Sequence, residues 1–595
     1  MKKILFYTVC VLMAVSCSLD RAPLDEESVD TFYKDEAQLQ MAVNYFYDKL
    51  LPGYKEIYDV SVADLYFSSD KLDKLQLGGK NRIAPASYVA SDYRWNWGIL
   101  RYINETLQNM DKCKDEAVAR KYTGLSYFFR AYFYFLQLRD FGDVPWYDHA
   151  LTSTDPDLYR PRDSRDFIMQ KILEDLDNAI AMLPEDKQAY RITKWEALLI
   201  KSRVALFEGT WHKYHTETQY DKSADYYLAI AADAAKTFIE TAPYHIYNTG
   251  NPASDYQHLF STGTTVEEEV LLGRNFNLNL SNSHFASRST FADKKMAVNK
   301  KFIDMFLMAD GSRFTDQAGW ETKQFYDEMT GRDPRLAQII RCPGYHLIDY
   351  DIIWAPSFAN SLTGFNCCKF AVSATVVGPD EAWSGEEGDL PVFRAAEVYL
   401  NYAEAQAERS DYNITQADID LSIKPLRDRA GMPNLSLAQA NANPDNAYLG
   451  SSKYGYTNVS GANKGVILEI RRERAVELAQ ELDFRWYDLM RWKAGNCMTQ
   501  DLRGMYFPGY GEYDLDNDGK LDICIYKGAQ PATTATSLLN VESGATVEFS
   551  QGTSGYIVPF ASKKRNFNQD RDYLYPLPTG DLEINYGLTQ NPGWE

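Results

Sequence analysis

The segment AVARKYTGLSYFFRAYFYFLQLR, residues 117–139, has the clearest helical pattern in the chain. Its large apolar residues recur at spacings of three and four, which places them on one face of a helix; they are Leu125, Phe128, Phe129, Tyr132, Phe133 and Leu136. Gly124 and Ala131 are small enough to let another helix come close. The helix is predicted to end at residues 141–145 (FGDVP), because Gly and Pro interrupt helices.

Other amphipathic segments are predicted to be helices; they cover residues 36–50, 95–107, 166–182, 193–208, 223–241, 392–408 and 466–493. Such neighbouring helices favour tetratricopeptide-like pairs, in which each pair covers the apolar face of the one before. Residues 246–390 are rich in Gly, Asn, Ser, Pro and aromatics and read as an irregular loop insertion. The predicted fold is therefore α-rich, with helical repeats in 17–245 and 391–500 and an irregular C-terminal region, 501–595, packed on the helices.

The N-terminus has the order of regions expected of a secretory signal, first positive, then apolar, then small residues. Met1-Lys2-Lys3 is followed by an almost wholly apolar run from Ile4 to Val15, too short to span a bilayer. Residues 14–17 (AVSC) resemble the bacterial lipobox, although Ala14 stands where Leu is usual. The sequence therefore predicts a signal peptide over residues 1–16 and a lipid on Cys17. The alternative is an ordinary signal peptide in which Cys17 is incidental.

The composition limits which classes of ligand the protein can bind. A net charge of -21 argues against nucleic acid, which requires a basic face. It also disfavours strongly anionic polysaccharides, unless a local basic patch overrides the mean. The 42 Tyr and 11 Trp are typical of exported sugar-binding proteins, although most single rings are expected to be core. The cysteines after Cys17 show no CxxC pair and are expected to be mostly buried small apolar residues.

Five motifs stand in order along nearly the whole chain. They are Cys17-Ser18-Leu19-Asp20 with Pro23; residues 130–136 (RAYFYFL) followed by FGDVP; residues 394–405 (RAAEVYLNYAEA); residues 470–478 (IRRERAVEL) with 484–492 (FRWYDLMRW); and residues 575–578 (YPLP) with 590–594 (QNPGW). Together they resemble the SusD/RagB family of outer-membrane nutrient-binding lipoproteins. Asp483 is a minor departure, because the family more often has Gly at that position.

The resemblance implies about four tetratricopeptide-like helix pairs in one α-rich domain. It also implies a lipid-anchored cell-surface protein of the outer membrane that works with a SusC/RagA-type TonB-dependent transporter. Most family ligands are glycans, so the expected function is to bind oligosaccharides and pass them to that transporter. A peptide ligand, as in the RagB branch, is the alternative.

An enzyme is the rival class. No GxSxG, HExxH or Walker A motif is present, and no catalytic residue is assigned. An all-α glycoside hydrolase would need only two carboxylates, which a sequence cannot exclude, but the helical pattern and the family resemblance disfavour it.

The motif of residues 470–492 is unusually rich in charge, and we interpret its charges as structural. Arg474 with Glu477 and Glu481 with Arg485 are spaced for contact along a helix, whereas Glu469 and Glu473 have the same sign. The planar Arg side chains could also bind loop carbonyls and fix the irregular regions to the scaffold.

The first candidate ligand site is Trp95-Asn96-Trp97 with Asp70 and Arg82. A sugar ring has an apolar face and a hydroxylated rim, so its binding needs a flat aromatic ring beside hydrogen-bonding groups. The resemblance places ligand contacts in this general segment and in loops of the insertion, where the candidate rings are Trp320, Trp354 and Trp383. For each of these rings, packing in the core or within a loop is the competing interpretation.

A third candidate is the loop DLDNDGKLD, residues 514–522. Carboxylates at positions 1, 3, 5 and 9 with Gly at position 6 follow the pattern of a calcium-binding loop. The predicted ligands of a structural Ca²⁺ are Asp514, Asp516, Asp518, Asp522 and the carbonyl of Lys520. Position 12 is Ile525 instead of Glu, so the loop is not a complete EF-hand, and a plain acidic turn is the alternative.

Overall fold

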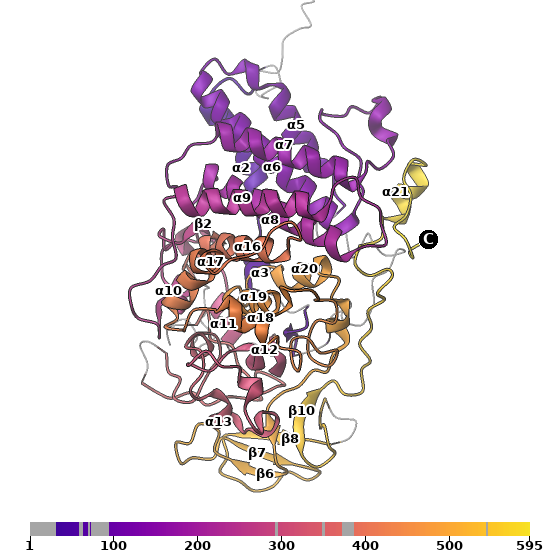
Figure 1. Ribbon diagram of the computed structural model, residues 1–595. Coiled ribbons are helices and arrows are strands. Elements are labelled where there is room, and N and C mark those ends of the chain that lie inside the picture. The colour runs from indigo at the N-terminus through magenta and orange to yellow at the C-terminus, as the bar shows by residue number, and fades with distance from the viewer. Residues whose placement is uncertain are drawn as a thin grey trace, which may run out of the picture.

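The computed structural model describes residues 31–58, 63–69, 72, 95–291, 296–347, 351–371, 386–542 and 546–595. The N-terminal helices form the upper part of the molecule in Figure 1, a second group of helices lies beneath them, and small sheets form the lower end. The predicted signal peptide and Cys17 lie outside the described residues. Within the described ranges, no helix has both the length and the apolar character needed to cross a membrane.

The main helices among the described residues of the upper part are, in sequence order, α2 (Glu36–Leu50), α5 (Gly98–Gln108), α6 (Glu116–Phe141), α7 (Arg165–Met182), α8 (Lys194–Tyr214) and α9 (Ala224–Thr241). Side chains of Asp115, Ser164, Thr193 and Ser223 cap the N-termini of α6 to α9. Each of these helices packs against the next along the chain. A Cβ on Gly124 would lie 2.9 Å from the Cβ of Met182, so this glycine permits the close approach of α6 and α7. The predicted fold of paired helices is confirmed.

The second group begins with α16 (Ala395–Glu408), which packs against α8 and α9 above it and against α17 (Gln416–Arg429) and α19 (Lys464–Glu477) beside it. The short helix α18 (Leu437–Ala442) packs on α19. No helix is predicted from the sequence over the span of α17, which contains Pro425. Its N-terminus is nevertheless fixed by a capping box between Thr415 and Asp418, and its apolar face is buried.

The prediction of a single helix over residues 466–493 is wrong. The structure has two helices, α19 and α20 (Phe484–Arg491), separated by Gln480 and Leu482 in the left-handed conformation, with φ of 56° and 47°. Other segments satisfy the backbone at the break: Lys369 Nζ donates to the carbonyl of Ala479, and the Leu482 amide donates to the carbonyl of Ile57. Tertiary contacts therefore stabilise an interruption that the sequence pattern does not reveal.

A strand stands where the sequence predicts the first turn of the helix 392–408. Residues Leu390–Arg394 form β4, which pairs antiparallel with β2 (Val270–Arg274) across an irregular register, and α16 starts only at Ala395. The pairing ties the insertion to the start of the second helical group.

The insertion, 246–390, contains short elements between its loops: α10 (Asp255–Ser261), β2, α11 (Ala286–Phe291), β3 (Ala297–Val298), α12 (Lys300–Met305), α13 (Phe325–Met329) and α14 (Arg335–Ile339). Strand β3 pairs antiparallel with β1 (Tyr66–Phe67), and α3 (Tyr54–Tyr58) lies near α11 and β4.

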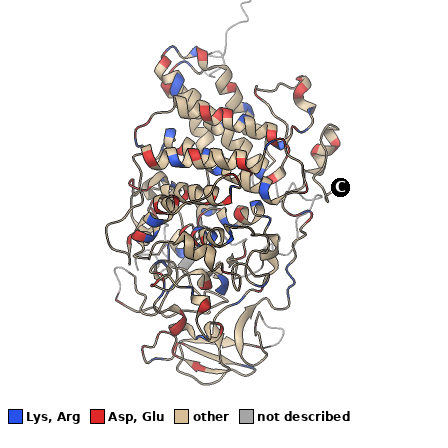
Figure 2. Ribbon diagram, viewed as in Figure 1, with Lys and Arg blue, Asp and Glu red and all other residues tan. Residues whose placement is uncertain are grey.

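The C-terminal region 501–595, expected to be irregular, carries two three-stranded sheets. One has the order β5–β10–β9 (Tyr506–Phe507, Gly555–Pro559, Val547–Phe549) and is antiparallel. The other has the order β6–β7–β8 (Gly511–Tyr513, Ile523–Tyr526, Ser537–Asn540), and its β7–β8 pair is parallel. Figure 2 shows few charged residues on these strands. The strands are too short for their alternation to be visible in the sequence, and the chain then returns to the helices through α21 (Thr579–Ile584).

One large hydrophobic cluster joins the upper helices, the second group, much of the insertion and residues of the C-terminal strands. All cysteines of the described ranges are free, and all but the half-buried Cys342 are buried, which confirms their prediction as packing residues.

Candidate functional site

Trp95 and Trp97 lie at the start of α5, on either side of the exposed Asn96. Their rings meet edge to face, with centroids 5.3 Å apart, so they do not form one flat platform. Trp95 packs against Phe141, and Trp97 packs against Phe133, Tyr134 and Tyr147. Each indole is half-buried. The pair therefore contributes to core packing on one side and presents part of its surface to solvent on the other.

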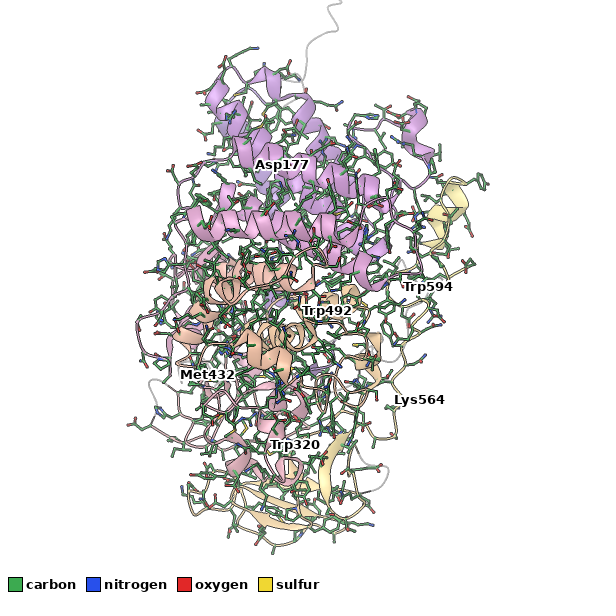
Figure 3. All side chains as sticks on the ribbon, viewed as in Figure 1. Asp177, Trp320, Met432, Trp492, Lys564 and Trp594 are labelled. Carbon is green, nitrogen blue, oxygen red and sulfur yellow. The ribbon has the colours of Figure 1, made fainter. Side chains whose placement is uncertain are left out.

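Of the other predicted ligand residues, Trp320 and Trp354 lie in the part of the chain that the structure describes. Asp70, Arg82 and Trp383 lie outside the described residues. Trp320 lies in the lower part of the molecule in Figure 3, far below the helix α5 of Figure 1, and packs edge-on against Tyr448 and Tyr454. Trp354 is half-buried and packs against a small cluster formed by Leu347, Cys368 and Ala371. The structure thus separates Trp320 from Trp95.

The aspartate loop brings three of its four carboxylates together. Ligand oxygens of Asp514, Asp516 and Asp522 all lie within 4.8 Å of one another. Asn517 and Gly519 adopt left-handed conformations, with φ of 67° and 87°, which turn the backbone around the carboxylate of Asp514. That carboxylate accepts hydrogen bonds from the amides of Asn517 and Gly519, at 2.7 and 2.8 Å.

Electrostatics distinguish the four aspartates of this loop. Burial, together with the neighbouring carboxylates, raises the pKa of Asp516 and of Asp522. The side chain of Asp518 turns instead to Lys520, whose Nζ lies 2.6 Å from Asp518 Oδ2, and this hydrogen bond lowers the pKa of Asp518. Crowded carboxylates with raised pKa values are the arrangement that a bound cation would relieve.

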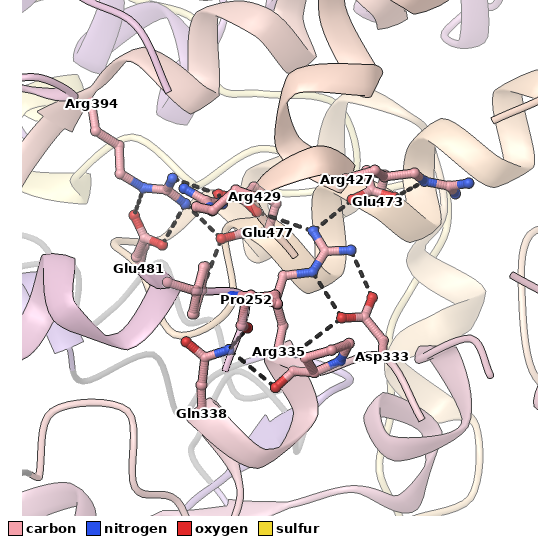
Figure 4. A network of polar contacts seen from close by, with 12 residues as sticks. Pro252, Asp333, Arg335, Gln338, Arg394, Arg427, Arg429, Glu473, Glu477 and Glu481 are labelled. Carbon is pink, nitrogen blue, oxygen red and sulfur yellow. Dashed lines mark hydrogen bonds and ion pairs between the residues drawn. The ribbon is translucent and has the colours of Figure 1, made fainter. Parts of the chain in front are cut away.

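The charged side chains of the motif helix α19 take part in a buried ionic network that reaches other segments (Figure 4), and Arg472 also pairs with Glu469 within the helix, at 2.9 Å. Glu477 accepts hydrogen bonds from Arg335, Arg394 and Arg429 and is fully buried. Arg394 also binds Glu481, at 2.6 and 2.8 Å, and Glu269, at 2.9 Å. Burial alone would raise the pKa of Glu477, but the three guanidinium groups outweigh it and hold the pKa well below its usual range.

The spacing-based pairs of the motif helix are therefore wrong. Arg474 binds Asp488, 2.8 Å away, and Arg485 binds Asp64, at 2.7 Å, so neither contacts the predicted partner Glu477 or Glu481. A motif arginine does bind a backbone carbonyl of the insertion, but in a helix and not in a loop: Arg472 donates to the carbonyl of Met305, the last residue of α12, at 3.1 Å. These charges join the insertion to the helices, and they are structural.

Sequence analysis missed a surface groove beside α2. It is lined by residues from α2, α6, the loop between α7 and α8, strand β2 with the residue after it, and β4; they include Tyr47, Tyr190, Arg191, Arg274 and Asn275. No sequence signal marks it, because its residues come from separate segments that only the fold brings together.

Comparison with known proteins defines the class of protein. The model of the SusD family matches residues 210–594, and a family model described as "Starch-binding associating with outer membrane" matches residues 19–206. The chain therefore belongs to the SusD family, as the sequence motifs predict.

Individual relatives are distant. A SusD-like protein P2 from Formosa agariphila is 24% identical over 236 residues, which cover 36% of this chain and 45% of that protein. The chain thus matches less than half the length of this curated relative. A SusD-like protein from Bacteroides fragilis NCTC 9343 has a TM-score of 0.67 at 21% identity, covering 96% of this chain and 100% of the other. A SusD-like carbohydrate binding protein from the same strain also has a TM-score of 0.67 at 21% identity, covering 94% and 100%.

Proposed function

We propose that this protein is a cell-surface lipoprotein, anchored through Cys17 to the outer membrane, that binds oligosaccharides and delivers them to a SusC-type TonB-dependent transporter. Membership of the SusD family is the observation that carries the proposal. The description of the second family model, which names starch binding and the outer membrane, supports the ligand class and the location. One of the similar solved structures is itself named as carbohydrate-binding.

The architecture fits a protein that binds its ligand reversibly and does not cleave it. The paired helices form one continuous core with the insertion, and the motif charges are occupied in buried ion pairs. A rigid scaffold of this kind holds surface side chains in fixed positions, which lowers the entropic cost of binding a flexible glycan. A lipid on Cys17 would keep the scaffold at the membrane, with each buried methylene contributing about 0.8 kcal/mol.

The chain from residue 18 onward, which retains every residue that the structure describes, is expected to bind oligosaccharides in calorimetric titrations against a glycan panel. Within this proposal Trp95 contacts the ligand with its exposed surface. We expect Trp95→Ala to weaken binding about fivefold, because a ring stacked on a ligand contributes on the order of 1 kcal/mol. Trp95→Phe, which keeps a flat ring, should retain most of the affinity.

Two results would count against this function. If Trp95→Ala lowers the melting temperature and leaves affinity unchanged, the ring serves packing alone. If the protein binds peptides and no glycan, the peptide-binding alternative replaces the oligosaccharide. Release of cleaved product from a bound glycan would instead place the protein among the glycoside hydrolases.

We further propose that the aspartate loop holds a structural Ca²⁺, with Asp514, Asp516 and Asp522 as carboxylate ligands. Ca²⁺ takes six to eight oxygen ligands at about 2.3–2.6 Å, so backbone carbonyls and water would complete the set. The proximity of three carboxylates, two of them buried, fits this cation. The ion would neutralise their repulsion and fix the loop next to strand β7.

Chelation by EDTA is expected to lower the melting temperature, and added Ca²⁺ should restore it. Asp516→Asn removes a buried ligand and should abolish this response. Asp518→Asn is the matched control, because that carboxylate binds Lys520. Melting curves of the three proteins with and without Ca²⁺ measure the effect; identical curves for the unchanged chain would reject the ion.

A further inference from the structure

The groove beside α2 consists of two adjoining hollows of about 140 and 360 Å³. They share Asn44, Tyr47 and Arg191, so they form a continuous depression along one side of the helix. The larger hollow also contains Tyr190 and residues 272–275 of β2 and the loop after it. At about 360 Å³ it falls within the size range of small-ligand pockets.

Buried Asp389 holds two side chains of the larger hollow in place. Its Oδ2 accepts a hydrogen bond from the Tyr190 hydroxyl at 2.7 Å, and its Oδ1 accepts one from the Asn275 amide at 2.9 Å. Thr265 donates two further bonds to Oδ2, from its amide and its hydroxyl. Tyr190 nevertheless remains 42% exposed. A flat ring and an amide are thus fixed side by side before any ligand arrives.

Two guanidinium groups line the same hollow without a carboxylate partner. Arg191 lies over the ring of Tyr47, 5.3 Å from its centroid, and donates to Asn44 Oδ1 at 2.9 Å. Arg274 donates to the carbonyl of Pro52 at 2.8 Å. Neither forms an ion pair with any residue in the described ranges. These neutral contacts fix the orientation of both groups and leave their positive charges uncompensated.

Against the two guanidinium groups stands the carboxylate of Asp389, which accepts hydrogen bonds from neutral groups behind Tyr190 and Asn275. The acidic residues that line the groove pair with lysines. Asp48, the acidic residue lining the larger hollow, pairs with Lys49 at 2.8 Å. In the smaller hollow, Glu36 pairs with Lys121 at 3.1 Å. The larger hollow is therefore a local positive site on a chain whose net charge is -21. In a protein with this overall charge, two arginines that line one pocket without carboxylate partners point to an anionic ligand group.

We propose that this hollow binds an anionic sugar residue of an oligosaccharide, with Arg191 and Arg274 holding its carboxylate or sulfate. Tyr190 stacks on the apolar face of the sugar ring, and Asn275 and Asn44 contact its hydroxyl groups. The inference rests on the proposed oligosaccharide-binding function and specifies the ligand class. A planar guanidinium binds a carboxylate or a sulfate through paired hydrogen bonds, which a neutral hydroxymethyl group cannot replace.

The test compares matched glycans. Calorimetry measures the binding of the chain from residue 18 to tetramers of galacturonate, glucuronate and mannuronate, to the neutral galactose, glucose and mannose tetramers of the same linkages, and to sulfated galactan oligosaccharides. At least one anionic glycan is expected to bind about tenfold more tightly than its neutral counterpart, and more weakly as salt is raised. The uronate and sulfate members distinguish the two sources of negative charge.

Variants assign the preference to the groove. Arg274→Gln and Arg191→Gln should each remove most of the preference, so that the anionic glycan binds about as tightly as its neutral counterpart. Tyr190→Ala should weaken both. Arg120→Gln is the matched control, because Arg120 also binds a backbone carbonyl, that of Ala181, but lines neither hollow. Melting curves identify any variant that loses binding through unfolding. If one arginine variant unfolds, the other variant tests the groove assignment.

The outcomes separate this inference from the proposed function. If glycans bind with no preference for the anionic members, or if both arginine variants keep the preference, the groove assignment fails and the glycan-binding function stands. If no glycan binds, both fail.

Discussion

Replacement of Arg394 by alanine is expected to lower the free energy of unfolding by about 3–5 kcal/mol, because it leaves buried carboxylates without their partner. Arg394 binds Glu269, Glu477 and Glu481, and all three are buried. In this variant Glu477 and Glu269 still form ion pairs with Arg429, and Glu481 still forms one with Lys369. Denaturant titration followed by tryptophan fluorescence measures the loss.

A double variant separates the cost of leaving the Glu481 carboxylate buried without Arg394 from the loss of the other Arg394 contacts. Adding Glu481→Gln to Arg394→Ala removes a buried carboxylate that has lost its main partner, so the double variant should regain part of the stability. Lys424→Ala on helix α17 is the control, because Lys424 and Asp428 form an exposed pair worth less than about 1 kcal/mol. A loss for Arg394→Ala no larger than that of the control would show that the network contributes little.

Replacement of Trp492 by alanine is the second substitution for which we expect a large effect, about 3–5 kcal/mol of stability. Trp492 lies in the middle of the molecule (Figure 3) and has no exposed surface. Its Nε1 donates to Glu404 at 2.6 Å, and the guanidinium of Arg471 lies 4.2 Å from its ring centroid. The substitution creates a cavity and removes a hydrogen bond from a buried carboxylate.

The same denaturant titration measures this loss. Tyr586→Ala is the control, because the Tyr586 side chain is 92% exposed and its removal should change stability by less than about 0.5 kcal/mol. Glu404 retains two hydrogen bonds from Arg491, so the structure predicts a weakened but folded protein. A loss below about 1 kcal/mol would mean that the core closes over the missing ring.

Both variants concern the same motif of residues 470–492, and they show why the motif carries so many charges. Helix α19 packs against α16, α17 and α18 of the second group and against α12 of the insertion, and its arginines and glutamates are buried. A buried charge is tolerated only when it is paired and hydrogen-bonded. The motif therefore specifies how irregular segments attach to the helices.

Local patterns were sufficient to predict the helices and the class of protein. The segment 117–139 predicts its helix to within a turn of the observed α6, because apolar periodicity and flanking Gly and Pro act over a few residues. The same kind of evidence correctly placed α2, α7, α9 and most of α16. The five motifs predicted the family, since each is a short stretch readable on its own.

Only the tertiary structure decided the break between α19 and α20, the partners of the buried charges and the existence of the groove. The partners of Arg485 and Arg394 lie up to 421 residues away in the sequence, and charge has no periodicity that could identify them. The groove likewise joins Tyr190, Arg274 and Asn44 from three separate segments. By itself, the sequence determined which segments are helical and to which family the chain belongs, because those properties depend on neighbours along the chain. The ion pairs and the positive hollow depend on neighbours in space, and these exist only once the chain has folded.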